Sequence, residues 1–434
     1  MNEYGSQTHR GAINQMASGA WIRTVGFIRR QERNFKIVLT RRALHAFLSN
    51  LTYQYRSIYI VALGADPVQL GSLQSVGNGI SSLISVPVGW LIDRYDLKKV
   101  FLLGIAMLAG AGLFYASAPH WMMLFPAVIL FSLGLRLTCE SCTVTCAHSL
   151  PNPDRATGRG LCTSISSAAA MFSPLVGAFL ITLFGGLNAR GIRPLYAIQF
   201  AGFSLIFAFI ATKLTDSRAA RPKREDLNFI RDLREVFSHG QGLKRWILIN
   251  ALVTIPFSMV FPYMPLFAHE HRGADEYLLG GMTTATALLT ILMSVPLGRV
   301  ADRIGRKRVL FLVAPLCYAA NLALVFGRGS AILLAVGALF GFYQISWTVT
   351  SAMTAELVSI DQMGRWIGVL GLFRGLVSVP GPIIGGMIWN QIGPAYVFLI
   401  PIAIDLVMRL PLLATMKETL GSQEDTDICL PTPG

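Results

Sequence analysis

The chain has 434 residues, of which 53% are apolar and 14% charged, with a mean hydropathy of +0.53 and a net charge of +14. A soluble domain carries roughly a quarter charged residues, so this composition excludes a secreted disulfide scaffold or a disordered chain and indicates a protein whose solvent is mostly lipid. The basic excess does not indicate a nucleic-acid partner, because the Lys and Arg residues lie mostly in short segments between apolar runs.

Residues 1–38 form a mixed basic segment before the first long apolar run. Trp21 and Phe27 alternate there with Arg23 and Arg29, so no unbroken apolar core of a cleavable signal peptide is present. We predict a cytoplasmic N-terminal segment that holds an interfacial amphipathic helix or, as the alternative, a disordered basic arm.

Twelve apolar stretches follow, and each is long enough to cross a bilayer as a helix. They lie near residues 39–64, 67–92, 99–118, 120–148, 160–187, 192–213, 246–270, 276–301, 308–327, 329–356, 366–391 and 394–416. The sequence therefore predicts an all-α integral membrane protein with twelve transmembrane helices.

Basic residues are distributed unevenly between the two sides that these spans define. With both termini cytoplasmic, the outer loops hold only Arg190, Arg193, Arg272 and Arg328, whereas the inner segments hold most of the 37 Lys and Arg residues. Cytoplasmic loops carry such an excess, so the bias predicts cytoplasmic termini and a multi-pass protein of the plasma membrane.

One long polar segment divides six spans from six. We predict that it is a cytoplasmic linker with a helix lying on the membrane surface. The predicted organisation is an N-terminal half at 39–213, the central linker at 214–245, a C-terminal half at 246–416 and a cytoplasmic tail at 417–434.

The two halves repeat one another. SVPVGWLIDRYDLKKV at 85–100 returns as SVPLGRVADRIGRKRV at 294–309, and GADPVQLG at 64–71 returns as GADEYLLG at 273–280, both with an offset of 209. Two homologous six-helix halves in parallel orientation are the plan of a transporter with its site between the repeats.

The longer repeat also resembles a family signature. Its Gly, Asp-Arg and following basic residues are similar to the loop between helices two and three of the major facilitator superfamily. The resemblance implies two pseudo-symmetric halves that rock around a midplane cavity, with this loop latching the outward-facing state; topogenic charge alone is the alternative. The gating-loop candidates are Gly89, Asp93, Arg94, Gly298, Asp302 and Arg303.

Two intramembrane pairs of opposite charge are candidates for proton coupling. Arg136 and Glu140 lie four residues apart on the fourth span and so share a helix face, as do Asp405 and Arg409 on the twelfth. Ionisable groups inside a membrane are costly, and they are functional candidates for that reason. Arg136 also resembles the helix-four arginine of the family's proton-coupled drug antiporters. A pair that merely neutralises itself remains the alternative for Asp405 and Arg409.

Further polar residues within spans are predicted to line a substrate cavity. Arg56 and Arg374 lack a local carboxylate, so each needs a distant carboxylate, a cavity or an anionic substrate. For Arg56, snorkelling toward the outer interface is the alternative. The cavity candidates are Arg56, Tyr53, Tyr55, Asn78 and Arg374.

Small residues with proline mark bends and close packing in the fifth and eleventh spans. The Gly-Pro-x-x-Gly-Gly pattern of the eleventh span resembles one found in helix five of family antiporters, which implies export, and the fifth span holds a weaker copy. The residues are Pro174, Gly177, Gly381, Pro382, Gly385 and Gly386.

No cofactor is predicted. Cys139, Cys142, Cys146 and Cys162 allow a soft-metal relay, but helix packing is the favoured interpretation because these residues lack a closed Cys and His cage, and no metal is predicted. The chain has no Gly-x-x-x-x-Gly-Lys-Ser/Thr motif, so ATP is not expected to be the energy source, and nothing predicts an enzyme.

We therefore predict a secondary transporter that works by alternating access, with proton-coupled export of amphipathic or drug-like small molecules as the favoured activity. Uptake or exchange of an anionic solute, lipid or lysolipid transport, and a non-transporting membrane sensor are the alternatives. The expected partners are membrane lipid, a small-molecule substrate and protons, without nucleic acid, and the chain is predicted to act as a monomer.

Overall fold

The computed structural model describes residues 33–84, 87–88, 91, 95–148, 155–214, 243–357, 360–416 and 418. Within these ranges it leaves out the side chains of residues 140–148, 155–160, 244, 355–356, 360–365 and 367–369. The predicted interfacial and linker helices, and the first gating loop with Gly89, Asp93 and Arg94, lie outside the described residues.

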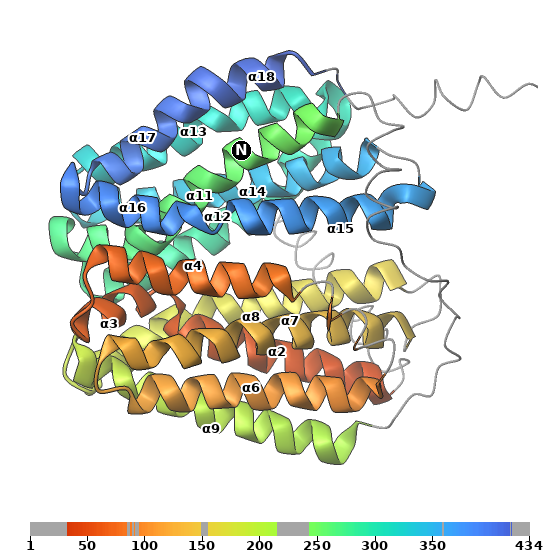
Figure 1. Ribbon diagram of the computed structural model, residues 1–434, viewed down its shortest axis with the longest axis vertical. Helices are drawn as coiled ribbons and strands as arrows, with labels where there is room; N and C mark the ends of the chain where they lie inside the picture. Colours follow the sequence, from red (N-terminus) through yellow and green to blue (C-terminus); the bar gives the residue numbers. More distant parts are fainter. Residues whose placement is uncertain are drawn as a thin grey trace, which may run out of the picture.

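The chain forms two bundles of roughly parallel and antiparallel helices, drawn from red to yellow-green and from green to blue in Figure 1. The first bundle consists of α2 (Arg33–Tyr53), α3 (Arg56–Ala62), α4 (Pro67–Leu83), α6 (Leu97–Ser117), the 3₁₀ turn η1 (Trp121–Met123), α7 (Leu124–His148), α8 (Arg155–Leu183) and α9 (Ala189–Lys213). The second consists of α11 (Leu243–Arg272), α12 (Glu276–Ile304), α13 (Arg306–Phe326), α14 (Ser330–Glu356), α15 (Ile360–Val377), α16 (Pro380–Gln391), α17 (Tyr396–Ile404), the π-helix η3 (Asp405–Arg409) and α18 (Leu410–Ala414).

The prediction of an all-helical membrane protein is confirmed, with 10 helices of the described part long and apolar enough to cross a membrane. The predicted spans 39–64 and 67–92 are not among them. A continuous first span is wrong, because the helix is interrupted at Gln54 and Tyr55 between α2 and α3. The second span is described as an uninterrupted helix only as far as Leu83.

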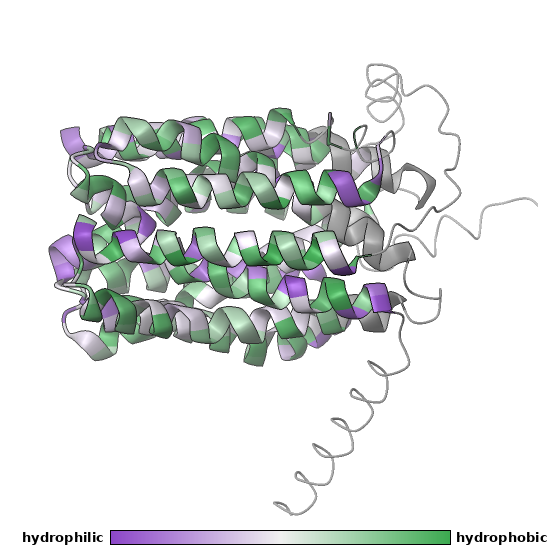
Figure 2. Cartoon of the chain, turned by 90° about the horizontal axis from the view of Figure 1, so that it is seen from below, coloured by the Kyte–Doolittle hydropathy of each residue, from purple (hydrophilic) through white to green (hydrophobic). Residues whose placement is uncertain are grey.

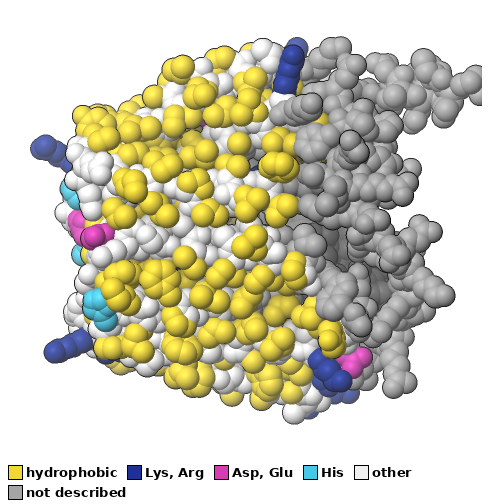
Figure 3. Space-filling view, viewed as in Figure 1, with side chains coloured by type: hydrophobic (Ala, Val, Ile, Leu, Met, Phe, Trp, Pro, Cys, Tyr) yellow, Lys and Arg dark blue, Asp and Glu magenta, His cyan; other side chains and the backbone are white. Residues whose placement is uncertain are grey.

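Apolar side chains cover the sides of the molecule, and charged side chains gather at its two ends (Figures 2 and 3). Leu205 and Val407, for example, expose 72% and 73% of their surface on these sides. A helical bundle in lipid satisfies its backbone polar groups within each helix and needs an apolar exterior, and this distribution meets both requirements.

The repeated Gly-Ala-Asp turns set the start of α4 and α12. Gly64 and Gly273 have φ angles of 89° and 67°, in the left-handed region that favours glycine. Asp66 and Asp275 then cap the helices, since each side chain accepts a hydrogen bond from the backbone N–H three residues on, at 2.8 and 2.7 Å. The shorter sequence repeat is therefore a repeat of helix starts.

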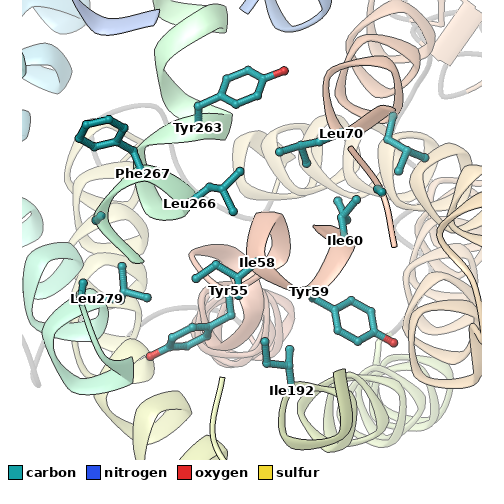
Figure 4. Packing of buried hydrophobic residues seen from close by; sticks show 14 of the residues in the cluster. Tyr55, Ile58, Tyr59, Ile60, Leu70, Ile192, Tyr263, Leu266, Phe267 and Leu279 are labelled. Atoms are coloured by element: carbon teal, nitrogen blue, oxygen red, sulfur yellow. The ribbon is translucent and has the colours of Figure 1, made fainter. Parts of the chain in front are cut away.

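A buried apolar cluster joins the two bundles near these turns. Figure 4 shows Tyr55, Tyr59 and Leu70 of the first bundle beside Tyr263 and Phe267 of the second. The hydroxyl groups of Tyr55 and Tyr263 point in opposite directions from this cluster, toward different helices. Both tyrosines are 0% exposed, so their hydroxyl groups need partners within the protein.

Candidate functional site

The two bundles meet along two helix pairs that the internal repeat relates. α4 packs against α16 and α15, as Figure 1 shows, and α8 packs against α12. These contacts lie toward the end of the molecule that carries the turns 64–66 and 273–275, which we call the closed end. By the repeat, α4 is the equivalent of α12, and α8 is the equivalent of α16.

Tyr55 links the halves through its hydroxyl group. Its Oη lies 3.0 Å from the carbonyl oxygen of Pro174, in its own half, and 3.1 Å from that of Glu276, in the other half. A phenol has one proton to donate, so the two carbonyls share it. Tyr55 was predicted to line the cavity, and the structure instead buries its side chain completely at the junction of three helices.

Tyr263 makes the same link from the second half. Its hydroxyl donates to the carbonyl oxygen of Pro382, in its own half, at 2.6 Å and lies 2.9 Å from that of Pro67, in the first half. The two links are pseudo-symmetric copies, because their residues are related by the repeat offset. Tyr263 follows Tyr55 by 208 positions, Pro382 follows Pro174 by 208, and Glu276 follows Pro67 by 209. We call these two residues with their four carbonyls the tyrosine seal.

Glycine allows the backbones at the tyrosine seal to approach closely. A Cβ at Gly71 of α4 would overlap the carbonyl oxygen of Pro382 and lie 2.6 Å from Tyr263 Oη. A Cβ at the equivalent Gly280 of α12 would lie 3.0 Å from the carbonyl oxygen of Pro174. Small residues at such crossings are what close helix packing in a membrane requires.

The predicted helix-bend residues all lie at or near these contacts. Pro174 lies inside α8 and Pro382 inside α16. A Cβ at Gly177 would lie 2.8 Å from the carbonyl oxygen of Leu51, and one at Gly385 would lie 2.8 Å from the ring of Tyr263. Gly381 and Gly386 make still closer approaches, to Ser258 of α11 and to Pro67 at the start of α4.

Among the described residues, the contacts between the halves do not run the full length of the helices. At Gly375 of α15 an added Cβ would overlap the Ser82 side chain of α4, whereas at Gly371, one turn earlier, it would meet no atom within 4 Å. On the second helix pair, Thr284 still donates to the carbonyl oxygen of Met171 at 3.1 Å, but Gly298 again faces open space. Within the described part of the chain, the contacts between the halves are therefore concentrated at the closed end.

A chain of polar side chains leads from Arg56 to the second half. Arg56 donates to Gln74 Oε1 at 2.7 Å, Gln74 Nε2 donates to Asn78 Oδ1 at 3.3 Å, and Asn78 Nδ2 donates to the carbonyl oxygen of Ser378 at 3.2 Å. In a continuous helix the Ser378 carbonyl would accept from the N–H of residue 382, but that residue is a proline and has no N–H. Asn78 supplies the missing hydrogen bond. Tyr53, under the Arg56 guanidinium at 5.8 Å, is 52% exposed.

Arg136 and Glu140 share α7, as predicted. Arg136 Nε donates to Ser81 Oγ of α4 at 2.9 Å, so the arginine faces the second span. The Glu140 side chain is outside the described part of the structure. The predicted pairing of these two residues, and their role in coupling, stay predictions.

Asp405 and Arg409 form a buried ion pair between η3 and α13. Arg409 Nη2 donates to Asp405 Oδ2 at 2.6 Å, Arg409 Nε donates to Oδ1, and the Tyr318 hydroxyl of α13 also donates to Oδ2. Their side chains are 14% and 7% exposed. The π-helix places both polar side chains inward, while Leu406, Val407 and Met408 between them are at least half exposed.

The second gating loop is bonded within its own half. Asp302, which is exposed, pairs with the partly buried Arg306. Glu418 Oε1 accepts from the backbone N–H groups of Arg306 and Lys307 at 2.9 and 3.2 Å, and Lys307 Nζ donates to the carbonyl oxygens that end α18. Arg303 is exposed. The described contacts of this loop therefore tie α13 to the end of α18.

Several polar residues of these contacts were not predicted. Tyr263 could have been found by applying the repeat offset to Tyr55. Arg41, at the start of the first predicted span, was not singled out; it lies within α2, is 3% exposed, and holds its guanidinium 4.7 Å from the centroid of the Phe101 ring. No sequence signal distinguishes it from the neighbouring topogenic charges.

The predicted interpretation of the cysteines as packing residues is only partly tested. Cys139 is exposed and Cys162 is buried, and the side chains of Cys142 and Cys146 are outside the description. Among the described residues no group of three His, Cys, Asp or Glu side chains is placed to hold a metal ion.

The chain is similar to several drug-resistance and efflux proteins. It is 27% identical over 183 residues to the class B tetracycline resistance protein of Escherichia coli, a match that covers 42% of this chain and 45% of that protein. It is 24% identical to the multidrug resistance protein MdtG of Klebsiella pneumoniae, over 85% of this chain and 90% of that protein. With macrolide efflux protein A of Streptococcus pyogenes it shares 22% identity over 72% of this chain and 78% of that protein.

Solved structures share the fold. The nucleoside transporter NupG superposes with a TM-score of 0.71 at 15% identity, over 89% of this chain and all of that one. A bacterial homologue of the lysosomal transporter Spinster, inward-facing and unoccupied, gives 0.62 at 16% identity, over 88% of this chain and 94% of that one. The family model of the Major Facilitator Superfamily matches residues 43–283 and 247–422, and by this match the chain belongs to that superfamily of membrane transporters.

Proposed function

We propose that this transporter exports amphipathic or drug-like small molecules in exchange for protons. The main support is the tyrosine seal, which joins the halves at one end while Gly371 and Gly298 face open space beyond it. A site that opens to one side at a time is what alternating access requires. The names of the similar proteins, which concern tetracycline, macrolides and multiple drugs, support export.

The distribution of charge supports an orientation. The inner segments of the predicted topology hold most Lys and Arg residues, and the closed end carries the predicted outer loops. We infer that the closed end faces outward in the plasma membrane, that both termini are cytoplasmic, and that the structure is the inward-facing state. The units that rock are then 39–213 and 246–416, with the chain acting as a monomer.

Glu140 is the favoured proton carrier, because Arg136 lies one helical turn away and is engaged by Ser81 of another helix. A carboxylate whose arginine partner changes its contacts between states is able to take up a proton in one state and release it in the other. We expect Glu140→Gln to abolish accumulation driven by a pH gradient in proteoliposomes and to preserve substrate exchange that moves no net proton.

Asp405→Asn tests the second candidate carrier in the same assay. If only this variant loses gradient-driven accumulation, Asp405 is the carrier. Retention of the unmodified rate by both variants would show that the carboxylate mechanism is wrong and would favour facilitated diffusion or sodium coupling.

The tyrosine seal makes a separate prediction about the balance of states. Tyr55→Phe and Tyr263→Phe each keep the ring and remove a hydrogen bond of about 1 kcal/mol, which is about a fivefold shift in an equilibrium. We expect each variant to increase the population with a separated closed end by about this factor. Spin labels at the exposed residues Met122 and Ser330, one in each half, measure that separation.

Tyr396→Phe is the matched control for this measurement, because Tyr396 is 47% exposed on α17. Its distance distribution is expected to equal that of the unmodified chain. Equal distributions for all three variants would mean that the hydroxyl bonds do not hold the halves together.

A further inference from the structure

Arg374 lies at the inner edge of the contact between the halves, beside Gly375. Its Nε donates to Asn250 Oδ1 of α11 at 2.8 Å, and its Nη2 donates to the same oxygen. Asn250 Nδ2 donates to the carbonyl oxygen of Trp246 at 2.8 Å, which fixes the amide with its oxygen toward the arginine. Two of the five guanidinium N–H groups are thus used on one neutral oxygen.

The positive charge of Arg374 has no counter-ion among the described residues, where no carboxylate lies within 4 Å of it. Asp361 is on the same helix but about 20 Å away along its axis. The guanidinium is also not among the enclosed polar groups of the described part that lack a partner. Its Nη1 atom, which donates no hydrogen bond within the described residues, is therefore accessible rather than enclosed. An uncompensated charge within a membrane is costly, so an anion that binds there is stabilised.

An aromatic surface adjoins this charge. The Arg374 guanidinium carbon lies 4.7 Å from the centroid of the Trp347 ring of α14, which remains 38% exposed. Phe257 of α11 stacks beside Trp347 at 6.1 Å between centroids, and Tyr343 follows at 6.2 Å from Phe257. A small cavity at Asn250, Phe373 and Arg374 opens between α11 and α15.

We propose that Arg374, Asn250 and Trp347 form an anion subsite of the substrate cavity and that the substrates are amphipathic aromatic acids. The carboxylate or sulfonate of such a molecule accepts hydrogen bonds from the Nη1 N–H groups of Arg374, and its ring packs on Trp347 and Phe257. The proposal rests on the proposed function, in that it names the substrate class of the same transporter.

Equilibrium binding to the full chain in nanodiscs tests the proposal, with naphthalene-2-carboxylate and the neutral naphthalene-2-carboxamide as probes. A charge-assisted hydrogen bond to the guanidinium predicts about ten- to a hundredfold tighter binding of the carboxylate. We expect Arg374→Gln to remove this preference, Arg374→Lys to keep part of it, and Trp347→Leu to weaken both probes alike. Arg190→Gln, at an exposed residue in the first turn of α9, is the matched control and should bind both probes as the unmodified chain does.

Equal binding of the two probes by the unmodified chain would overturn the proposal, as would an unchanged preference in Arg374→Gln. If Arg374→Gln fails to fold, the Arg374→Lys and Trp347→Leu variants decide in its place. An unchanged affinity of Trp347→Leu for both probes then overturns the proposal. Binding needs no gradient. A chain that prefers the carboxylate but shows no proton-driven transport therefore counts against the proposed function and supports the subsite.

Discussion

Replacing Gly71 with alanine is expected to prevent the closed end from forming. The added methyl group would overlap the carbonyl oxygen of Pro382 and crowd the Tyr263 hydroxyl at 2.6 Å. A backbone carbonyl within a helix does not rotate away, so α4 and α16 must separate. Since only the sealed state is strained, the equilibrium shifts to the state with the opposite opening. We expect transport to fall at least about tenfold and the distance between labels at Met122 and Ser330 to increase.

Gly79→Ala is the control for this experiment. Gly79 lies two turns further along α4 at the same interface, and its added Cβ would lie 3.6 Å from Val379 Cγ2, an ordinary van der Waals contact. Its transport rate and label distances should equal those of the unmodified chain. Gly71→Ala with an unchanged distance distribution would contradict the proposed role of this crossing.

The internal repeat made much of the fold predictable. The equivalence of 64–71 with 273–280 predicted homologous halves, and the structure uses both copies as helix starts that present Gly71 and Gly280 at the helix crossings. Such features depend on local sequence, that is, on a left-handed glycine, an Asp cap and a small residue seven positions on. They repeat because the two halves share a fold.

The interruption of the first span could not be predicted from the sequence. Tyr53-Gln54-Tyr55 contains neither proline nor glycine, and its residues fit an unbroken helix as well as the surrounding ones do. The structure binds the Tyr55 hydroxyl to carbonyls of two other helices, one of them in the other half. These two partners are separated from Tyr55 by 119 and 221 positions in the sequence, and contacts over such separations leave no local pattern.

The candidate cavity shows the same division between local and distant contacts. That Arg374 needs a partner follows from its position in an apolar span. The identity of the partner depends on how α11, α14 and α15 pack. This packing brings Asn250, 124 positions earlier, to the guanidinium and places Trp347 under it. Asp405 and Arg409 are the opposite case, because pairing at four residues' spacing on one helix is visible in the sequence.

Removing one partner of the Asp405 and Arg409 pair is expected to destabilise the fold strongly. In Arg409→Met, the Tyr318 hydroxyl is the one partner that the Asp405 carboxylate keeps among the described residues, in a place where its side chain is 14% exposed. Breaking a buried ion pair in this way costs about 3–5 kcal/mol. We expect a clear decrease in the apparent melting temperature of the purified protein in detergent.

Asp302→Asn is the control, because it breaks a more exposed pair, with Arg306, at the same spacing. It should change the stability by at most about 1 kcal/mol.

The double variant Asp405→Leu with Arg409→Met separates a structural pair from a proton carrier. Well-packed apolar residues in place of a buried ion pair leave stability unchanged or increase it, so the double variant should melt near the unmodified chain. A stable double variant that still accumulates substrate under a pH gradient would show that the pair only neutralises itself between η3 and α13, and Glu140 would remain as the carrier. A double variant that is equally stable but accumulates nothing would assign the proton to Asp405. A double variant that melts as early as Arg409→Met would mean that the carboxylate and guanidinium are needed for their hydrogen bonds with Tyr318 and η3, and not only to cancel each other's charge.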